Sequence, residues 1–274
     1  MRANVIFIDE VSQIETALWA QLNKVQGVQW LIAGDFNQMP PFFDTWRGSQ
    51  VHEEALAKSS FFKDLAGCNR LLLTEGHRSD MVLFNFYSSL IAGGARFAQP
   101  LPIVLEAART LCSFEGPARH NLVISHRRRI RLNRELNKTF IPAGVTPRFV
   151  RASPKRGQLC SAQNLWLWAG IELLGCVQAS RKGIRNNVLY SVTALGEDHA
   201  TLEPTEGPGE GIELTYPQVA DWLRLSFAQT YASVQGTEFS DSLRLHDTVH
   251  AHFSMRLLFV AMSRGKQCAK LAIS

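Results

Sequence analysis

The sequence has few cysteines and no long apolar run. Its 274 residues include five cysteines, scattered and without a Cys-x-x-Cys pair. This pattern does not fit a disulfide framework or a zinc knuckle, and it favours a reducing compartment. No stretch is long and apolar enough to cross a bilayer. Residues 1–4 lead directly into an apolar run, without a signal-peptide pattern. We therefore expect an intracellular protein, nuclear or cytoplasmic, with no membrane partner.

The composition is also free of extremes. Hydrophobic residues make up 46% of the chain and charged residues 19%, an ordinary globular balance without a sign of disorder. The length allows one or two domains with a sizeable core. The net charge of +5 permits a polyanionic partner but does not require one.

Two apolar runs that stop abruptly at acids organise the chain. Val5–Ile8 is followed by Asp9 and Glu10, and Trp30–Ala33 is followed, after one glycine, by Asp35. Short, continuously apolar runs predict strands that are buried on both faces of a parallel sheet. Because ligands of open α/β sheets bind beyond the carboxyl ends of the strands, we expect the three acids to line one rim of the sheet.

The chemistry of this rim suits nucleotide hydrolysis. Phosphoryl transfer needs a carboxylate that holds Mg²⁺, a group that orients the attacking water, and cations near the developing phosphate charge. Asp9 is the candidate Mg²⁺ ligand and Glu10 the candidate base, while Gln38 is placed to orient water or to sense the γ-phosphate. For Val5 to Glu10 alone, a buried strand capped by two solvated acids is the favoured explanation of the pattern.

The second run ends in a more specific pattern, Gly34-Asp35-x-x-Gln38-x-Pro40-Pro41. Together with the Asp-Glu strand, it resembles motifs II and III of superfamily 1 helicases, in the branch of the RecD and Pif-type DNA helicases. The resemblance implies ATP and Mg²⁺ as cofactors. It also implies that Asp9, Asp35 and Gln38 lie at the nucleotide, with Asp9 as the metal ligand.

Two arginines extend the resemblance. Leu71-Leu72-Leu73-Thr74 predicts a strand, and Arg78 follows it just before a helix that begins near Met81. This resembles motif IV, whose arginine reaches the γ-phosphate; an exposed arginine near a helix start is the plainer alternative. Ala261-x-Ser263-Arg264, at the end of an apolar stretch, resembles motif VI with its second arginine finger. The implied catalytic residues are Asp9, Glu10, Gln38, Arg78 and Arg264.

A third group of motifs lies between these arginines. The strand that ends at Ser125 and the helix that starts at His126 resemble the beginning of a second RecA-like lobe. The resemblance implies that Ser125, His126 and Asn133 face single-stranded DNA. The arginines of this helix fit either a phosphate track with salt-dependent affinity or a solvated helix face, and the sequence leaves both open. These arginines are Arg127, Arg128, Arg131 and Arg134.

Ala228-x-Thr230 followed by Gln235-Gly236 resembles motif V. The resemblance implies that Gln235 and Gly236 lie at the nucleotide, and that Thr230 and Ser233 contact nucleic acid. Many family members carry His-Lys-Ser before Gln-Gly. This chain has Ala-Ser-Val at residues 232–234, which removes two polar side chains and a cation.

Residues 158–211 contain short β-rich runs separated by Gly and Asn turns, which predict a small antiparallel barrel. Their pattern resembles the SH3-like insertion in the second lobe of this branch. The expected fold is therefore α/β, with RecA-like P-loop NTPase lobes on parallel sheets and a β-barrel insertion. We expect part of a first lobe at residues 1–115, a second lobe at 116–157 and 212–274, and the insertion at 158–211.

The sequence also lacks the P-loop pattern Gly-x-x-x-x-Gly-Lys-Ser/Thr, whose amides, lysine and hydroxyl hold phosphates and Mg²⁺. In the family this motif precedes the Asp-Glu strand. We expect the core of an ATP-dependent DNA helicase that moves along single-stranded DNA, 5′ to 3′ by resemblance, with a missing amino-terminal segment that carries the P-loop. A non-catalytic nucleic-acid-binding remnant and a purely structural remnant are the alternatives.

Overall fold

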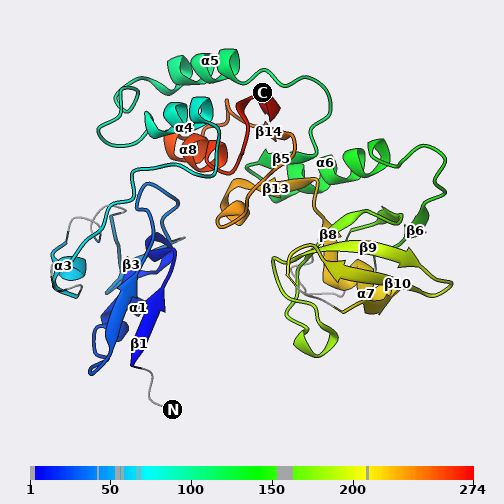
Figure 1. Cartoon of the computed structure of the whole chain (residues 1–274), viewed down its shortest axis with the longest axis horizontal. Helices are drawn as coiled ribbons and strands as arrows, with labels where there is room; N and C mark the ends of the chain where they lie inside the picture. Colours follow the sequence, from blue (N-terminus) through cyan, green and yellow to red (C-terminus); the bar gives the residue numbers. More distant parts are fainter. Residues whose placement is uncertain are drawn as a thin grey trace. The chain divides into compact units, whose positions relative to one another are not determined.

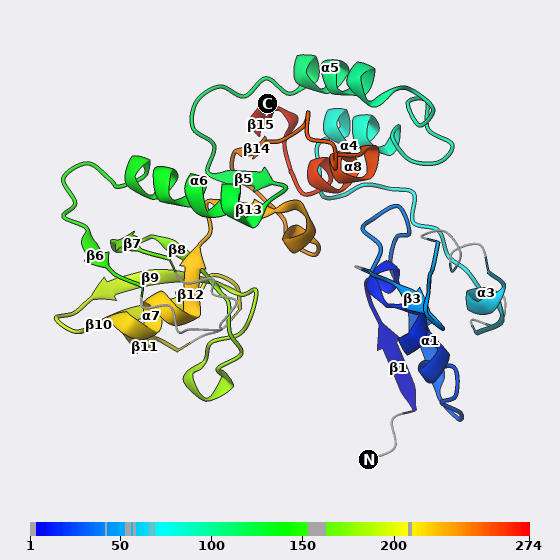
Figure 2. The ribbon, with the colours of Figure 1, turned by 180° about the vertical axis from the view of Figure 1, so that it is seen from behind.

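The computed structural model describes residues 4–41, 43–52, 56, 59–65, 67, 69–152, 163–207 and 210–274 (Figures 1 and 2). The chain divides into two units, and each is described by itself. Unit 1 comprises Met1–Cys112, Val234–Ser240 and His250–Lys270, and unit 2 comprises Ser113–Ser233, Asp241–Val249 and Leu271–Ser274. The first five residues of the expected β insertion, 158–162, lie outside the described residues.

Two parallel strands carry the first motif of unit 1. β1 (Val5–Ile8) pairs with β2 (Gln29–Ile32), and Ile8 lies opposite Ile32 at the carboxyl ends. The parallel pairing agrees with the sequence, but the expected burial on both faces is wrong. Val5 is 53% and Phe7 59% exposed. Leu31 of β2, on the same face, is also 59% exposed, so one face of the pair lacks a covering layer among the described residues. Within these residues β1 pairs with β2 alone.

Short elements surround this pair. They are η1 (Val11–Gln13), α1 (Thr16–Leu22), the hairpin of β3 (Thr45–Trp46) with β4 (Ser49–Gln50), and α3 (Phe61–Leu65). Trp19 is buried against the edges of Phe61 and Phe62, with ring centroids 5.7 and 4.9 Å away. Asp44 accepts hydrogen bonds from the backbone nitrogen and hydroxyl of Thr16, at 2.9 and 2.8 Å, and so holds the start of α1.

Four further helices complete the described elements of unit 1. They are α4 (Met81–Ser88), α5 (Leu101–Leu111), α8 (Met255–Met262) and η4 (Cys268–Lys270). α4 and α8 lie side by side in both views (Figures 1 and 2), and Tyr87 meets Phe259 edge to face at 5.9 Å. Asp80 caps α4 by accepting from the Leu83 nitrogen at 2.8 Å. The tyrosine–phenylalanine contact joins segments that are remote in sequence.

The strand expected at Leu71–Thr74 is not present. These residues have no strand pairing, and the three leucines are exposed. An apolar run becomes a strand only where a neighbour completes its hydrogen bonds. No described strand of unit 1 lies in register with this run.

Unit 2 contains a fully parallel sheet in the order β13 (Ala228–Thr230), β5 (His120–Val123), β14 (Leu243–Leu245), β15 (Leu271–Ile273). α6 (His126–Thr139) follows β5 and packs against β5 and β13 (Figure 1). A parallel sheet with a helix after its first strand is the arrangement expected of a RecA-like lobe.

A second, antiparallel sheet of unit 2 has the order β11 (Ile212–Thr215), β10 (His199–Pro204), β9 (Leu189–Leu195), β8 (Glu172–Gly175), β12 (Leu223–Leu225). Beside it lie α7 (Tyr216–Trp222), the pair β6 (Arg148–Val150) and β7 (Leu165–Leu167), and η2 (Ser180–Lys182). The short helix η3 (Tyr231–Val234) directly follows β13 of the parallel sheet. Figure 2 shows α7 against this sheet.

The expected short antiparallel strands are therefore confirmed, but a closed barrel is not seen. The sheet ends at β11 on one side and at β12 on the other among the described residues. It continues to Leu225, past the expected end of the insertion at residue 211. Its core is apolar and includes Leu173, Tyr190, Val192 and Leu202. No helix in the described part of the chain is both long and apolar enough to span a membrane.

Candidate nucleotide site and nucleic-acid interface

The two acids after β1 differ in their surroundings. Asp9 is exposed and accepts a hydrogen bond from the Glu10 nitrogen at 2.8 Å. Glu10 is half-buried and has a left-handed backbone, with φ 53° and ψ 46°. Such a conformation is uncommon for a residue other than glycine and is found at functional sites. The Oε2 atom of Glu10 is buried without a hydrogen-bond partner, so this carboxylate is available for a ligand or a water.

The ends of β1 and β2 are tied together. The Val11 nitrogen donates to the Ala33 oxygen at 3.0 Å. Gly34 has φ +146°, and a Cβ there would lie 2.5 Å from the Val11 nitrogen. Only glycine fits this close approach. Asp35 accepts from the backbone nitrogen and side-chain amide of Asn37, at 2.9 and 2.8 Å, so its Oδ1 holds its own loop.

Arg264 connects the last motif to the loop after β2. Its Nη2 donates to Gln38 Oε1 at 3.0 Å, and its Nε donates to the Val260 oxygen at 3.3 Å. The side chain is only 2% exposed. Gln235 Nε2 donates to the Met39 oxygen at 3.4 Å, so motif V also reaches this loop. Three motifs that are distant in sequence therefore meet at one loop of unit 1.

Charged groups surround the guanidinium of Arg264. Burial lowers the pKa of Arg264, Arg78 lowers it further, and Glu10 and Glu238 raise it. These groups thus lie within electrostatic range of one another. Arg78 is half-exposed, and its Nε lies 2.7 Å from Glu238 Oε1. Lys266 Nζ lies 3.5 Å from the other oxygen of the same carboxylate.

The reasoning from sequence missed Glu238. In the sequence, Glu238 is simply an acid two residues after Gly236, and no local pattern marks this position as functional. Gly236 has φ +75°, and a Cβ at this position would meet nothing within 4 Å, so this glycine serves the turn and not a close contact. Gln235 contacts the loop of Gln38 through the Met39 oxygen, and the placement of Gln235 and Gly236 at a nucleotide stays a prediction.

The expected nucleic-acid residues of unit 2 fall into two groups. Ser125 and His126 are exposed at the start of α6, where Ser125 Oγ accepts from the Arg128 nitrogen at 3.2 Å. Burial lowers the pKa of His126, and Arg129 and Arg224 lower it further. These two residues are therefore accessible to a polyanion.

Asn133 and Thr230 are buried. Asn133 Nδ2 donates to the Ala228 oxygen at 3.0 Å, and its Oδ1 accepts from the Ala228 nitrogen at 2.8 Å. The expectation that Asn133 faces DNA does not fit this placement, because its amide clamps β13 to α6. Ser233 is partly exposed and donates to the Thr230 oxygen at 2.9 Å.

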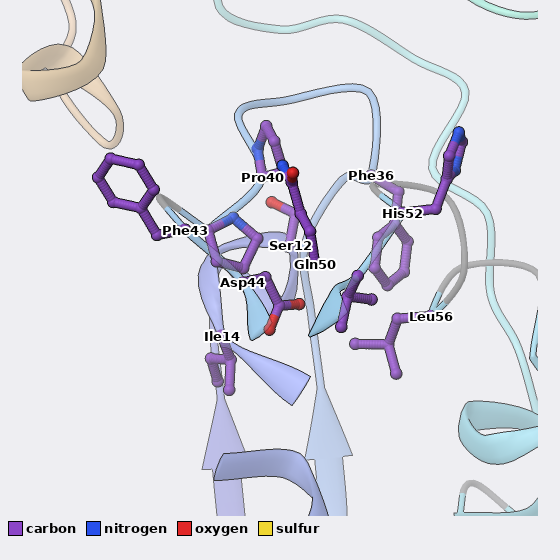
Figure 3. Close-up of a pocket in the computed structure, with 11 residues that line it drawn as sticks. Ser12, Ile14, Phe36, Pro40, Phe43, Asp44, Gln50, His52 and Leu56 are labelled. Carbon is purple, nitrogen blue, oxygen red and sulfur yellow. The ribbon is translucent and has the colours of Figure 1, made fainter. Parts of the chain in front are cut away.

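The surface has one hollow beside the loop after β2 and another on α6. Figure 3 shows one of about 70 Å³ beside the loop after β2, into which Phe36, Asp44 and Leu56 project. It is smaller than the several hundred Å³ typical of nucleotide-sized pockets, and none of the five expected catalytic residues lines it. The other, of about 310 Å³, lies on α6 and is lined by Ser125, Arg127, Arg128, Arg131, Leu132 and Glu135.

No group of three or more His, Cys, Asp or Glu side chains suited to a metal occurs among the described residues. The orphaned Glu10 oxygen and the buried Arg264 fit the γ-phosphate end of a nucleotide.

The parallel sheet of unit 2 and the helix after β5 form a mixed α/β fold that is consistent with RecA-like lobes. Solved structures of Pif1 helicases share it. The Candida albicans enzyme superposes with a TM-score of 0.68 at 16% identity, over 98% of this chain and 71% of that one. A Bacteroides Pif1 helicase in complex with ADP-AlF3 and ssDNA gives 0.61 at 19% identity, over 99% and 70%.

Pif1 helicases studied in DNA unwinding at forked dsDNA give a TM-score of 0.64 at 20% identity, over 98% of this chain and 68% of that one. At these identities the likeness shows the fold. No family model matches the chain, and no curated protein sequence matches it.

Proposed function

We propose that this chain forms the core of an ATP-dependent DNA helicase, which couples ATP hydrolysis to movement along single-stranded DNA in the 5′ to 3′ direction. One observation carries the proposal: the buried Arg264 donates to Gln38, with Glu10 and Arg78 in electrostatic range. The Bacteroides Pif1 structure, which holds ADP-AlF3 and ssDNA, supports the choice of ligands.

Each residue has a chemical role in this proposal. Asp9 would hold Mg²⁺, and the ion would supply positive charge that neutralises the phosphates. Glu10 orients and deprotonates the attacking water through its unpartnered oxygen. Gln38 and Arg264 are already hydrogen-bonded, so their positions are set before the nucleotide arrives. Arg78 exchanges its Glu238 partner for a phosphate oxygen.

The proposal requires a P-loop from outside this sequence, carried by a segment that pairs with β1. The exposed Val5 and Phe7 support this requirement, because an added layer would cover them. A sheet edge with apolar side chains also invites aggregation when it stays open. Translating the genomic DNA upstream of residue 1 in all frames tests this point; a clean promoter beside an unrelated gene would contradict it.

For the nucleic acid, Ser125 and His126 with the arginine face of α6 provide the contacts, and the antiparallel sheet corresponds to the SH3-like insertion. Binding then rests on phosphate contacts and weakens with salt, with a log-log slope of about −0.7 per contact for single strands. Affinity for a single-stranded oligonucleotide that is the same at low and high salt would contradict this interface.

A phosphate-release assay tests the enzyme. We expect negligible turnover from this chain alone, with or without single-stranded DNA, and turnover from a chain extended by the P-loop segment. In the extended chain, Glu10→Gln and Arg264→Ala should each abolish turnover, whereas Glu15→Gln, an exposed acid in the same unit, should not. Robust turnover by this chain alone that disappears in Glu10→Gln would refute the requirement for a P-loop.

The absent P-loop motif favours one second candidate, a non-catalytic nucleic-acid-binding remnant. Binding of single-stranded DNA by the extended chain without phosphate release would favour this second function. A chain that neither binds nor hydrolyses would refute both functions.

A further inference from the structure

Two cysteines that are remote in sequence meet inside unit 1. Cys112 directly follows α5, Cys268 is the first residue of η4, and the two are 156 positions apart. Their sulfur atoms lie 3.1 Å apart, in contact as a thiol–thiol hydrogen bond. Both cysteines are free thiols, and they are only 2% and 7% exposed. Neither thiol has a part in the proposed nucleotide site or nucleic-acid interface.

Hydrogen bonds fix the backbone on both sides of this contact. The Cys112 nitrogen donates to the Ala108 oxygen at 2.9 Å and so continues the last turn of α5. The Cys268 nitrogen donates to Asp80 Oδ2 at 2.6 Å, while the other oxygen of this carboxylate caps α4. Cys268 Sγ also lies 3.4 Å from the Leu111 oxygen. The fold therefore holds the two sulfurs together, and a shift of about 1 Å brings them to the length of a disulfide bond.

The two thiols differ in reactivity. Burial raises the pKa of both. The hydrogen bond between the sulfurs raises the pKa of Cys112 further but lowers that of Cys268, and the charge of Asp80 raises both. Because the thiolate is the attacking species in thiol–disulfide exchange, Cys268 is the thiol that reacts first.

Access to Cys268 depends on a short element. η4 is a 3-10 helix of three residues, Cys268–Lys270, whereas α5 has eleven residues. Hydrogen bonds in 3-10 helices have poorer geometry than those in α-helices, and local segments open at a lower free energy than a whole domain. A local opening of η4 exposes Cys268 to a small oxidant while Cys112 stays packed at the end of α5.

We propose that Cys112 and Cys268 form a redox-responsive pair, which a small-molecule disulfide converts into an intramolecular disulfide. The Cys268 thiolate attacks one sulfur of the small disulfide, so a mixed disulfide forms and one small thiol leaves. Cys112 then loses its proton and attacks the Cys268 sulfur, and the second small thiol leaves. The two electrons from the protein thiols reduce the small disulfide, and the two protons end on the released thiols. An excess of small thiol reverses both steps.

The bond would join two places at which the chain leaves unit 1. Cys112 is the last residue of the first segment of unit 1, and Cys268 lies two residues before Lys270, where the last segment of this unit ends. A disulfide stabilises a protein mainly by restricting the unfolded chain, and more so when the closed loop is long. The oxidised chain is therefore the more stable form. The inference concerns the cysteine pair and does not depend on the proposed helicase function.

Glutathione disulfide is the probe, and the full chain incubated with it is compared with the same chain kept in dithiothreitol. Peptide mapping by mass spectrometry without reduction should show Cys112 linked to Cys268, in a chain that still runs as a monomer on a non-reducing gel. The melting temperature of the oxidised chain should be higher by roughly 5 to 10 °C. Dithiothreitol should return it to the starting value.

Three variants test the order of the steps. Cys112→Ala should stop at the mixed disulfide, with glutathione on Cys268 and no rise in melting temperature. Cys268→Ala should leave Cys112 unmodified. Cys176→Ala, which removes a free thiol from unit 2, should keep both the link and the rise.

The peptide map of the natural chain decides the proposal even if a variant does not fold. Unlinked Cys112 and Cys268 after the incubation, or a link found only in a dimer, would overturn it. The same rise in melting temperature in Cys112→Ala would also overturn it, and glutathione on Cys112 in Cys268→Ala would refute the order of attack.

Discussion

Replacing Asn133 by alanine should destabilise unit 2 without acting on a nucleic-acid contact. Asn133 is fully buried, and its two hydrogen bonds hold the nitrogen and the oxygen of Ala228 in β13. Alanine would leave both backbone groups buried and unpaired. Each unsatisfied group costs about 1–3 kcal/mol, so we expect a loss of about 2–5 kcal/mol in the free energy of unfolding. This is a large part of the stability of an ordinary domain.

Urea unfolding followed by tryptophan fluorescence measures the loss, with the slope against urea unchanged. Asn137→Ala is a matched control. Its amide clamps Trp166 in the same way, with bonds of 2.7 and 3.0 Å, and a comparable loss is expected. Arg134→Ala, exposed on the same helix, should change stability by less than about 0.5 kcal/mol.

The reasoning would be refuted by an Asn133→Ala variant that is as stable as the natural chain but has lost affinity for single-stranded DNA. That result would return Asn133 to the interface that the resemblance implies. A variant that is less stable, yet binds normally once folded, supports the clamp.

Three further predictions concern pH and the candidate site. Burial lowers the pKa of His246 from 6.5 to about 4. As the pH drops, His246 is therefore protonated in the unfolded chain before it is protonated in the folded chain. The free energy of unfolding then falls between pH 6.5 and about 4. His246→Gln should remove up to about 3 kcal/mol of that pH dependence, measured by urea unfolding at each pH; an unchanged slope would contradict it. Gly34→Ala should destabilise unit 1 by about 2 kcal/mol or more, because its methyl group would meet a backbone nitrogen; proteolytic susceptibility of unit 1 that stays the same would argue otherwise. Glu238→Gln should release Arg78 and tighten the binding of a nucleotide to the P-loop-extended chain in a fluorescence titration; weaker binding would instead make this carboxylate part of the nucleotide site.

The sequence predicts the structure best where an element depends mainly on residues that are close together in the chain. Short apolar runs predicted β1 and β2, and β5 lies within the strand that was expected to end at Ser125. Burial was less predictable, because it depends on how many neighbours an element has. Phe7 is apolar and regularly spaced, yet it is exposed, since β1 pairs with β2 alone in the described chain. The contact between Arg264 and Gln38 could be expected only from the resemblance, because no local pattern joins residues so distant in sequence.

On helix α6, the expectation for Asn133 could have been corrected from the sequence alone. The resemblance implied that Asn133 faces single-stranded DNA, but helical spacing places it on one face with Arg129 and Leu136, at i, i+4 and i+7. That face is buried. A polar side chain on a buried helix face needs a partner. Asn133 has its partner within the chain, in the backbone of Ala228. Arg129 has none for its Nε and Nη1, so the same rule distinguishes a satisfied polar side chain from an unsatisfied one on a single helix face.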